Sequence, residues 1–169
     1  MMNFLRDINK RAVLGGVLSY IPGLYAWWDR RRPTGNAFSS EYSKSIWNFH
    51  FDNYQRLLGS KVIPKVVAEF GTGASLGSLI AAIKDDVKFV IGLDLVPYAD
   101  NFKLNKKILD EIIPPKKHPD LNNKISLEIA QISNPKSSSK IKYLAPWDKN
   151  NLVPSEYIDF IFSHSVLEH

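Results

Sequence analysis

Cysteine is absent from the 169 residues of this sequence, and arginine is confined to the first 56 of them. Without cysteine the chain has no disulfide, no thiolate metal ligand and no cysteine nucleophile, which fits a reducing, cytoplasmic location. No nucleic-acid-binding motif accompanies the net charge of +5, so nothing indicates a nucleic-acid partner. The remaining composition, 44% hydrophobic and 23% charged, predicts one globular domain with its own core.

One long uncharged stretch, residues 12–28, lies between Arg11 and a charged run at residues 29–32. A helix that spans a bilayer needs about 17 apolar residues or more, so this stretch is at the lower limit. Three glycines and a proline interrupt it, and no small-residue cleavage site follows. We expect a helix and turn that either pack on the domain or lie on a membrane surface, with residues 12–32 as the peripheral membrane contact.

The chain changes character after Gly59. Residues 1–58 are expected to form an N-terminal helical segment, in which Ser40 can cap a helix that ends at Gly59. Residues 59–169 alternate between buried β-branched runs and helical patterns, which is typical of an open α/β sheet. We expect strands at residues 62–70, 88–95, 141–145 and 158–163, and helices at residues 76–83 and 101–113. Residues 124–132 fit either a strand or a short helix, and residues 133–140 fit a loop.

A glycine-rich turn connects the first expected strand of this domain to its first expected helix. From Glu69 to Gly77 the residues follow the pattern E-x-G-x-G-x-x-x-G. Gly71 and Gly73 allow the positive φ and the close backbone approach that a ligand above the strand ends requires. Gly77 allows the following helix to pack tightly on the sheet, and the N–H groups at the start of that helix can bind a carboxylate or hydroxyls.

Two carboxylates flank this turn. Glu69 is among the last strand residues before it, where a carboxylate can balance a cationic ammonium group of a ligand. Asp94 ends the next strand, where a carboxylate can accept hydrogen bonds from both hydroxyls of a ribose, and Leu95 and Val96 can form one wall of an adenine slot. Nicotinamide and flavin enzymes also use glycine turns of this kind, and Glu69 could instead cap the following helix. These residues alone therefore leave the ligand open.

The last twelve residues, IDFIFSHSVLEH, carry the most specific pattern in the chain. Together with residues 66–81 and 90–96, they resemble the class I, Rossmann-like S-adenosylmethionine-dependent methyltransferases. The resemblance implies an α/β fold with a Rossmann-like methyltransferase sheet, helices on both of its faces, and S-adenosylmethionine as cofactor. It also implies methyl transfer to an acceptor that the sequence does not identify, with a small molecule or a glycan preferred. No metal site is indicated.

By position, the resemblance gives roles to residues at four strand ends. The cofactor loop would comprise Glu69, Gly71, Thr72, Gly73 and Gly77. Asp94 would bind the ribose and Leu95 would line the adenine slot, with Trp147 and Asp148 beside the adenine. Ser163 and His164 would border the methionine part of the cofactor. His164 and His169 are the candidates for a general base, which the reaction needs only when the acceptor is a poor nucleophile.

Two features depart from the family pattern. The stretch between Asp94 and Asp148 is too long for one helix and one strand, so residues 114–140 look like an insertion, and Asp148 could be a turn residue. The family's sheet has seven strands, whereas only four are expected here before the chain ends. We therefore expect a sheet that is incomplete at its C-terminus, and a truncated chain that is inactive. The alternatives are a nicotinamide-dependent oxidoreductase and a non-catalytic remnant that only binds the cofactor.

The interrupted stretch at residues 12–28 gives the first prediction. After expression in cells, the protein should be released from the membrane fraction by alkaline carbonate, because a helix broken by glycine and proline is a poor bilayer-spanning segment. Immunoblots of pellet and supernatant measure this, with a known integral membrane protein as the control. Full retention in the alkali-washed pellet would contradict the prediction.

Overall fold

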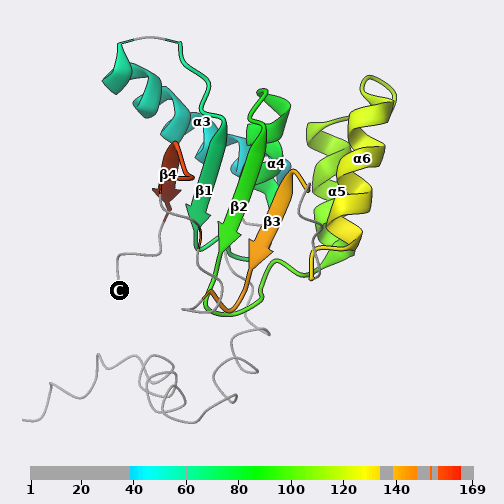
Figure 1. Ribbon diagram of the computed structural model, residues 1–169. Helices are drawn as coiled ribbons and strands as arrows, with labels where there is room; N and C mark the ends of the chain where they lie inside the picture. Colours follow the sequence, from blue (N-terminus) through cyan, green and yellow to red (C-terminus); the bar gives the residue numbers. More distant parts are fainter. Residues whose placement is uncertain (1–38, 60, 134–138, 148–152, 154–155, 165–169) are drawn as a thin grey trace, which may run out of the picture. The chain divides into compact units, whose positions relative to one another are not determined.

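Four short strands lie side by side in one parallel sheet, in the order β3-β2-β1-β4 (Figure 1). In this computed structural model the strands are β1 (Val66–Phe70), β2 (Phe89–Leu93), β3 (Ile141–Leu144) and β4 (Phe160–Ser163). They confirm the four expected strands, and each is shorter than the run that predicted it. The fold class is therefore α/β with an all-parallel sheet.

The structure describes residues 39–59, 61–133, 139–147, 153 and 156–164, all within a compact unit that spans Thr34–His169. The candidate membrane contact at residues 12–32, Asp148, His169 and most of the expected loop at residues 133–140 lie outside the described residues. The division of the chain into segments 1–58 and 59–169 stays a prediction. None of the described helices is long and apolar enough to cross a membrane.

The described residues form four helices beside the sheet: α3 (Ser40–Leu58), α4 (Gly77–Lys84), α5 (Phe102–Ile112) and α6 (Pro119–Ala130). Helices α3, α4 and α5 confirm the three expected from the sequence. Helix α6 includes most of residues 124–132, which fit a strand or a helix by sequence. It starts with proline in its first turn and buries Ile125 and Ile129, which lie on one helix face at i and i+4. Residues that look like an insertion by sequence thus supply part of the core.

Helix α3 is capped at both ends by its own sequence. Ser39, and not Ser40 as expected, is the N-cap residue, because it keeps the extended backbone that a cap requires and its Oγ accepts from Tyr42 N at 3.0 Å. Ser40 is instead the first helical residue and is buried. At the other end Gly59 terminates the helix in the left-handed conformation, with φ 64°, as the sequence predicts.

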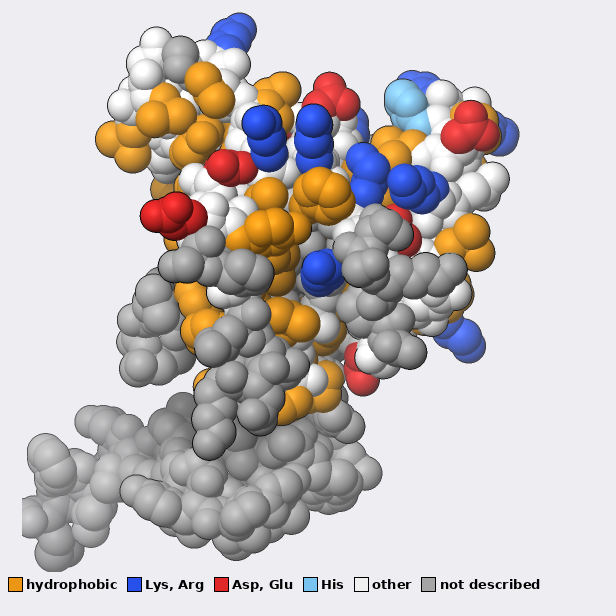
Figure 2. Space-filling model, viewed as in Figure 1, with side chains coloured by type: hydrophobic (Ala, Val, Ile, Leu, Met, Phe, Trp, Pro, Cys, Tyr) orange, Lys and Arg blue, Asp and Glu red, His pale blue; other side chains and the backbone are white. Residues whose placement is uncertain are grey.

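All four described helices pack on one face of the sheet. Each contributes a fully buried side chain to the core on that face: Trp47, Leu79, Leu109 and Ile125. The opposite face packs against loop residues, chiefly Trp147, Val153 and Ile158. Figure 2 shows hydrophobic side chains gathered over this opposite face, with cationic side chains toward the amino ends of the strands.

The expected helices on both faces are therefore found on only one face among the described residues. The physical reason is the path of the chain. Strands β1, β2 and β3 follow one another across the sheet in a single direction, and right-handed crossovers that run in one direction place their helices on the same side. The described residues between β3 and β4 contain no helix, so they cover the second face only with loop residues such as Trp147 and Ile158.

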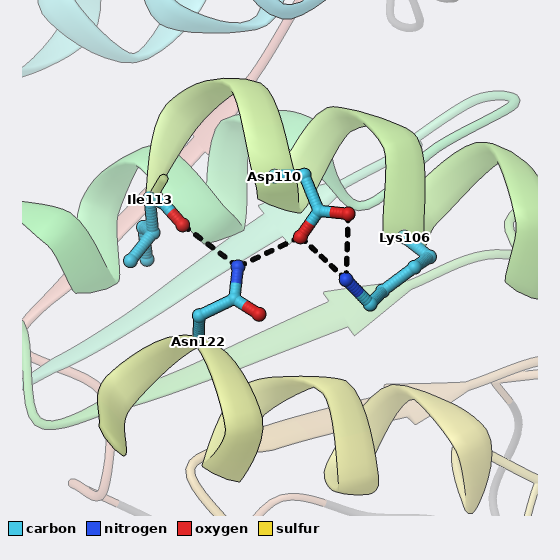
Figure 3. Close-up of polar contacts among 4 residues, drawn as sticks. All are labelled: Lys106, Asp110, Ile113 and Asn122. Atoms are coloured by element: carbon cyan, nitrogen blue, oxygen red, sulfur yellow. Dashed lines mark hydrogen bonds and ion pairs between the residues drawn. The ribbon is translucent and has the colours of Figure 1, made fainter. Parts of the chain in front are cut away.

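A polar network fastens α6 to α5 (Figure 3). Asn122 Nδ2 donates to Asp110 Oδ1 at 2.8 Å and to the Ile113 carbonyl at 2.7 Å. Asp110 is also paired with Lys106, one turn earlier on α5. At the far end of α6, Glu128 Oε2 accepts from two backbone N–H groups at the start of β3, at 2.7 and 3.0 Å. Helix α6 therefore links α5 to the edge strand β3.

The strand order reverses direction between β1 and β4. From β1 the chain moves outward through β2 to β3, and then returns to pair β4 with the other side of β1. The last residues of these two paired strands, Phe70 and Ser163, are register partners. In open α/β sheets, ligands bind at the carboxyl ends of the strands where the order reverses, which is where the glycine turn begins.

Gly77, the first residue of α4, makes room for a neighbouring helix. A Cβ at this position would lie 2.0 Å from Ser43 Oγ of α3 and 3.2 Å from Ile108 Cγ2 of α5. The expectation that Gly77 lets the helix approach the sheet is thus corrected. The close approach is between helices.

Replacing Gly77 with alanine should lower the free energy of unfolding by about 1–3 kcal/mol, the usual cost of overpacking. In an uncrowded helix the same change would stabilise by about 0.5–1 kcal/mol, so the sign of the effect tests the contact. Denaturant unfolding measures it. The double variant Gly77→Ala, Ser43→Gly removes the clashing atoms and should lose less than the two single losses added together. Additive losses would show that the two residues do not meet.

Candidate functional site at the carboxyl edge of the sheet

The glycine turn after β1 leaves its backbone open. Gly71 and Gly73 have φ values of 74° and 68°, which a residue with a side chain adopts only under strain. The Gly71 N–H donates to the Leu93 carbonyl at 2.9 Å, so the turn starts as a continuation of the sheet. A Cβ built at Gly73 would meet nothing within 4 Å. The turn therefore presents bare backbone at the strand ends, where a ligand could lie against it.

Glu69 is buried on the helix-covered face of β1, with 4% of its surface exposed. Its carboxyl accepts a hydrogen bond from the Ser78 hydroxyl in the first turn of α4. Burial raises the pKa of Glu69 to about 8, the Ser78 bond opposes this rise, and the charge of Asp94 adds to it. None of the ion pairs among the described residues involves Glu69. It is thus a buried carboxyl without a cation.

The alternative that Glu69 caps α4 does not match this arrangement. The N-cap residue of α4 is Leu76, whose own side chain makes no capping bond, and the Gly77 N–H donates to Ser75 Oγ at 3.4 Å. Glu69 instead accepts from a side chain of that helix, Ser78.

Asp94 is the second buried carboxylate, directly after β2, with 8% of its surface exposed. Its Oδ2 accepts from Thr72 Oγ1 at 2.5 Å and from the Tyr143 hydroxyl at 2.9 Å. Burial raises the pKa of Asp94 to about 6, whereas the bonds from Thr72, through its hydroxyl and its backbone, and from Tyr143 lower it. Asp94 therefore joins the glycine turn to β3.

Two buried polar residues that the sequence pattern missed extend these contacts. The Tyr143 hydroxyl also accepts from the Ala99 N–H at 3.2 Å. Asn105 of α5 is fully buried, donates to the Ala99 carbonyl at 2.7 Å and accepts from the Leu76 N–H at 2.9 Å. The sequence could have indicated both Tyr143 and Asn105. A hydroxyl in a buried strand and an amide on the apolar side of a helix each need a hydrogen-bond partner.

The aromatic candidate Trp147 is brought to this edge, whereas Leu95 is not enclosed. The backbone N–H of Trp147 donates to the Asp94 carbonyl at 2.7 Å. The indole ring of Trp147 contacts Phe70 edge to face, with ring centroids 4.9 Å apart. Its indole Nε1 is buried and has no hydrogen-bond partner among the described residues. Leu95 is 77% exposed, so its role as a wall of an adenine slot stays a prediction.

The candidates at the end of β4 lie on two different sides. Ser163 is the register partner of Phe70, and its Oγ is buried with no hydrogen-bond partner in the described part of the chain. His164 turns toward α3, where its ring is 6.3 Å from Tyr42 and 5.6 Å from His50. Burial, and then the charge of His164, lower the pKa of His50. The ring contacts of His164 are thus with α3, away from the bonds around Asp94, and its role as a general base stays a hypothesis.

Comparison of the chain with known proteins identified no related protein. No known protein family matches the chain, and no curated protein and no solved structure is significantly similar to it. The described residues also contain no group of three or more histidine, aspartate or glutamate side chains that could hold a metal ion. A function is therefore inferred from the sequence pattern and the geometry of this edge.

The buried carboxyl of Glu69 makes stability depend on pH. Its pKa rises from an ordinary 4.5 to about 8 on folding, so between these values the folded state holds a proton that the unfolded state releases. The stabilisation is complete below the lower value and is lost as pH rises through the higher one. From pH 6.5 to 8, the free energy of unfolding should fall by up to about 1.4 kcal/mol per pH unit.

Glu69→Gln should remove this slope, because the amide cannot ionise but its oxygen can still accept from Ser78. Denaturant unfolding at several pH values in this window compares the two proteins. The window lies above the pKa of Asp94, about 6, so Asp94 contributes little to the slope. Equal slopes in the two proteins would mean that Glu69 is ionised in the folded state.

Proposed function

We propose that this chain binds S-adenosylmethionine at the carboxyl ends of β1 and β2 and is a methyltransferase of the Rossmann-like class. The observation that carries the proposal is that a buried carboxyl, Glu69, lies just before an open glycine turn. Glu69 is buried without a cationic partner among the described residues, and the turn that follows it is open at Gly73, next to the reversal of strand order. That is where this class of sheet binds ligands.

A cationic ligand would supply the positive charge that the buried carboxyl of Glu69 lacks among the described residues. Burying a carboxyl that lacks a cationic partner disfavours its charged form, which is why its pKa rises. An ammonium group at this position would favour the ionised form and offset the cost of burial. The amino-acid part of S-adenosylmethionine carries such an ammonium group, whereas a nicotinamide dinucleotide offers none to Glu69.

The remaining candidates fit the other parts of the same cofactor. Asp94 lies one strand away from Glu69, where a carboxylate can accept from a ribose hydroxyl. Trp147 is bonded to the Asp94 carbonyl and leaves its indole N–H without a partner, which suits contact with a flat, polar base. Ser163 offers a second unpartnered polar group on the other side of Phe70.

S-adenosylmethionine, when bound, supplies an electrophilic methyl group for in-line displacement. The residues of this chain would contribute alignment of the acceptor and exclusion of water. A general base such as His164 is required only if the acceptor must lose a proton to react. The acceptor that we propose is a small molecule or a glycan.

Calorimetric titration with S-adenosylhomocysteine and with NAD tests the proposal. Wild-type protein should bind S-adenosylhomocysteine and should not bind NAD measurably. Binding of NAD alone would indicate the oxidoreductase, and binding of neither would reject a cofactor site at this edge.

Gly73→Val should abolish S-adenosylhomocysteine binding, because the new side chain occupies the space beside the turn. Gly59→Val is a matched control. Gly59 has nearly the same φ, 64° against 68°, and the same open space around its Cβ, but it lies at the end of α3. The left-handed backbone costs a residue with a side chain about 1–2 kcal/mol at either site, so only the contact with ligand differs. The pair Gly73→Asn and Gly59→Asn repeats the comparison with less strain. If both members of a pair bind equally well, the turn has no part in binding.

A further inference from the structure

Two hydroxyls from different parts of the chain hold the carboxylate of Asp94. Thr72 reaches it from the turn after β1, at 2.5 Å, and Tyr143 reaches it from β3, at 2.9 Å. Both bonds end on the same oxygen, Oδ2. Two donors that converge on one oxygen from opposite sides fix the carboxylate more tightly than either bond alone, because the group cannot turn without losing both.

A glycine in β2, the strand that ends just before Asp94, leaves space for both donors. Gly92 of β2 lies between the two donors, and a Cβ there would be 2.8 Å from Thr72 Cγ2 and 3.0 Å from Tyr143 Cδ2. Any side chain at this position would push the two residues apart. The absence of one at Gly92 is what lets both hydroxyls reach Asp94.

The same bonds form part of a closed ring that joins two loops. Asp94 and the glycine turn meet through Thr72, and the loop after Asp94 is held at Ala99 by Tyr143 and by Asn105. Asn105 then returns to the turn through the Leu76 N–H. Every link is a hydrogen bond between buried groups, so the loops at the ends of β1 and β2 are held together as one unit.

We propose that Tyr143 is a positioning residue: through Asp94 and Ala99 it fixes the ribose-binding carboxylate and the two cofactor-binding loops, without touching the cofactor itself. The assignment of these loops to a cofactor rests on the proposed function. The effect of Tyr143 on Asp94 does not depend on the proposed function. The effect on Asp94 and the binding of a cofactor can therefore be tested separately.

The electrostatics of the pair support this role. Among the described residues, the titratable group that acts on the pKa of Asp94 is Tyr143 of β3, whereas the charge of Asp94 in turn raises the pKa of Glu69 of β1. Burial, and then the charge of Asp94, raise the pKa of Tyr143, so its hydroxyl stays a neutral donor. Its hydrogen bond opposes the rise that burial imposes on the pKa of Asp94. Without Tyr143, Asp94 would take up a proton at a higher pH and cease to be a full acceptor.

Tyr143→Phe tests the hold on Asp94 directly. Carboxyl-carbon NMR of protein labelled at aspartate follows the titration of Asp94, whose signal is assigned by its absence in Asp94→Asn. The midpoint should be higher in Tyr143→Phe than in wild type, and unchanged in Tyr157→Phe, an exposed tyrosine outside the ring. An unchanged midpoint in Tyr143→Phe overturns the proposal.

A second pair of variants guards against misfolding of Tyr143→Phe. Thr72→Val removes the other hydroxyl from the same oxygen at nearly constant shape, and Thr72→Ser keeps it. The proposal expects a raised Asp94 midpoint in the valine variant and a wild-type midpoint in the serine variant. A raised midpoint in both would mean that packing, and not the converging hydroxyls, controls Asp94.

Titration with S-adenosylhomocysteine tests the consequence for binding. At pH 7 its affinity for Tyr143→Phe should fall about tenfold or more, because most of Asp94 is then protonated and is no longer a full acceptor, and should approach the wild-type value as pH rises and Asp94 ionises. A loss that is equal at every pH overturns the positioning role. If wild type does not bind this ligand while the Asp94 midpoint still moves, the proposed function fails and the hold of Tyr143 on Asp94 stands.

Discussion

The burial of Asp94 at the end of β2 is the constraint on which the carboxyl edge depends. A carboxylate that is 8% exposed must be given donors by the protein, and here they come from the glycine turn and from β3. Meeting that requirement fixes the conformation of Thr72, requires a tyrosine at 143 and leaves no space for a side chain at Gly92. One buried charge thus constrains residues on two strands, β2 and β3, and in the turn after β1.

The one-sided helix layer divides this edge into two chemically different halves. Alternation along β1 turns Glu69 toward α4 and turns Phe70 toward the opposite face. The helix side therefore holds the buried carboxyls and the hydroxyls that bind them. The other side holds Trp147 against Phe70, with the unpartnered Oγ of Ser163 beside the end of β1. A ligand that crosses the end of β1 would meet polar groups on one side and aromatic surface on the other.

The sequence predicted local structure well, because local structure depends on residues that are near one another in the chain. Short apolar runs marked all four strands, and Gly59 marked the end of α3. The shift of the N-cap from Ser40 to Ser39 is a choice between adjacent serines that both suit a cap. Residues 124–132 mix apolar and polar positions in a way that fits two periods, and only burial of Ile125 and Ile129 in the shared core selects the helix.

The candidate site could be predicted only where it depends on the turn itself. The positive φ of Gly71 and Gly73 follows from the spacing of glycines after a strand. The partner of Gly77 could not be predicted in this way, because α3 reaches it from a distant part of the chain. The bond between Tyr143 and Asp94 joins residues that are 49 positions apart, and only the strand order makes them neighbours.

The burial of Glu69 has a consequence for the heat of ligand binding. If a cation binds beside this carboxyl near neutral pH, the carboxyl must first give up the proton that burial has kept on it, and that proton passes to the buffer. Ligand binding would then exchange the proton on the Glu69 carboxyl for the cationic group of the ligand. The observed enthalpy would vary with the ionisation enthalpy of the buffer, and its slope would count the protons released per ligand bound.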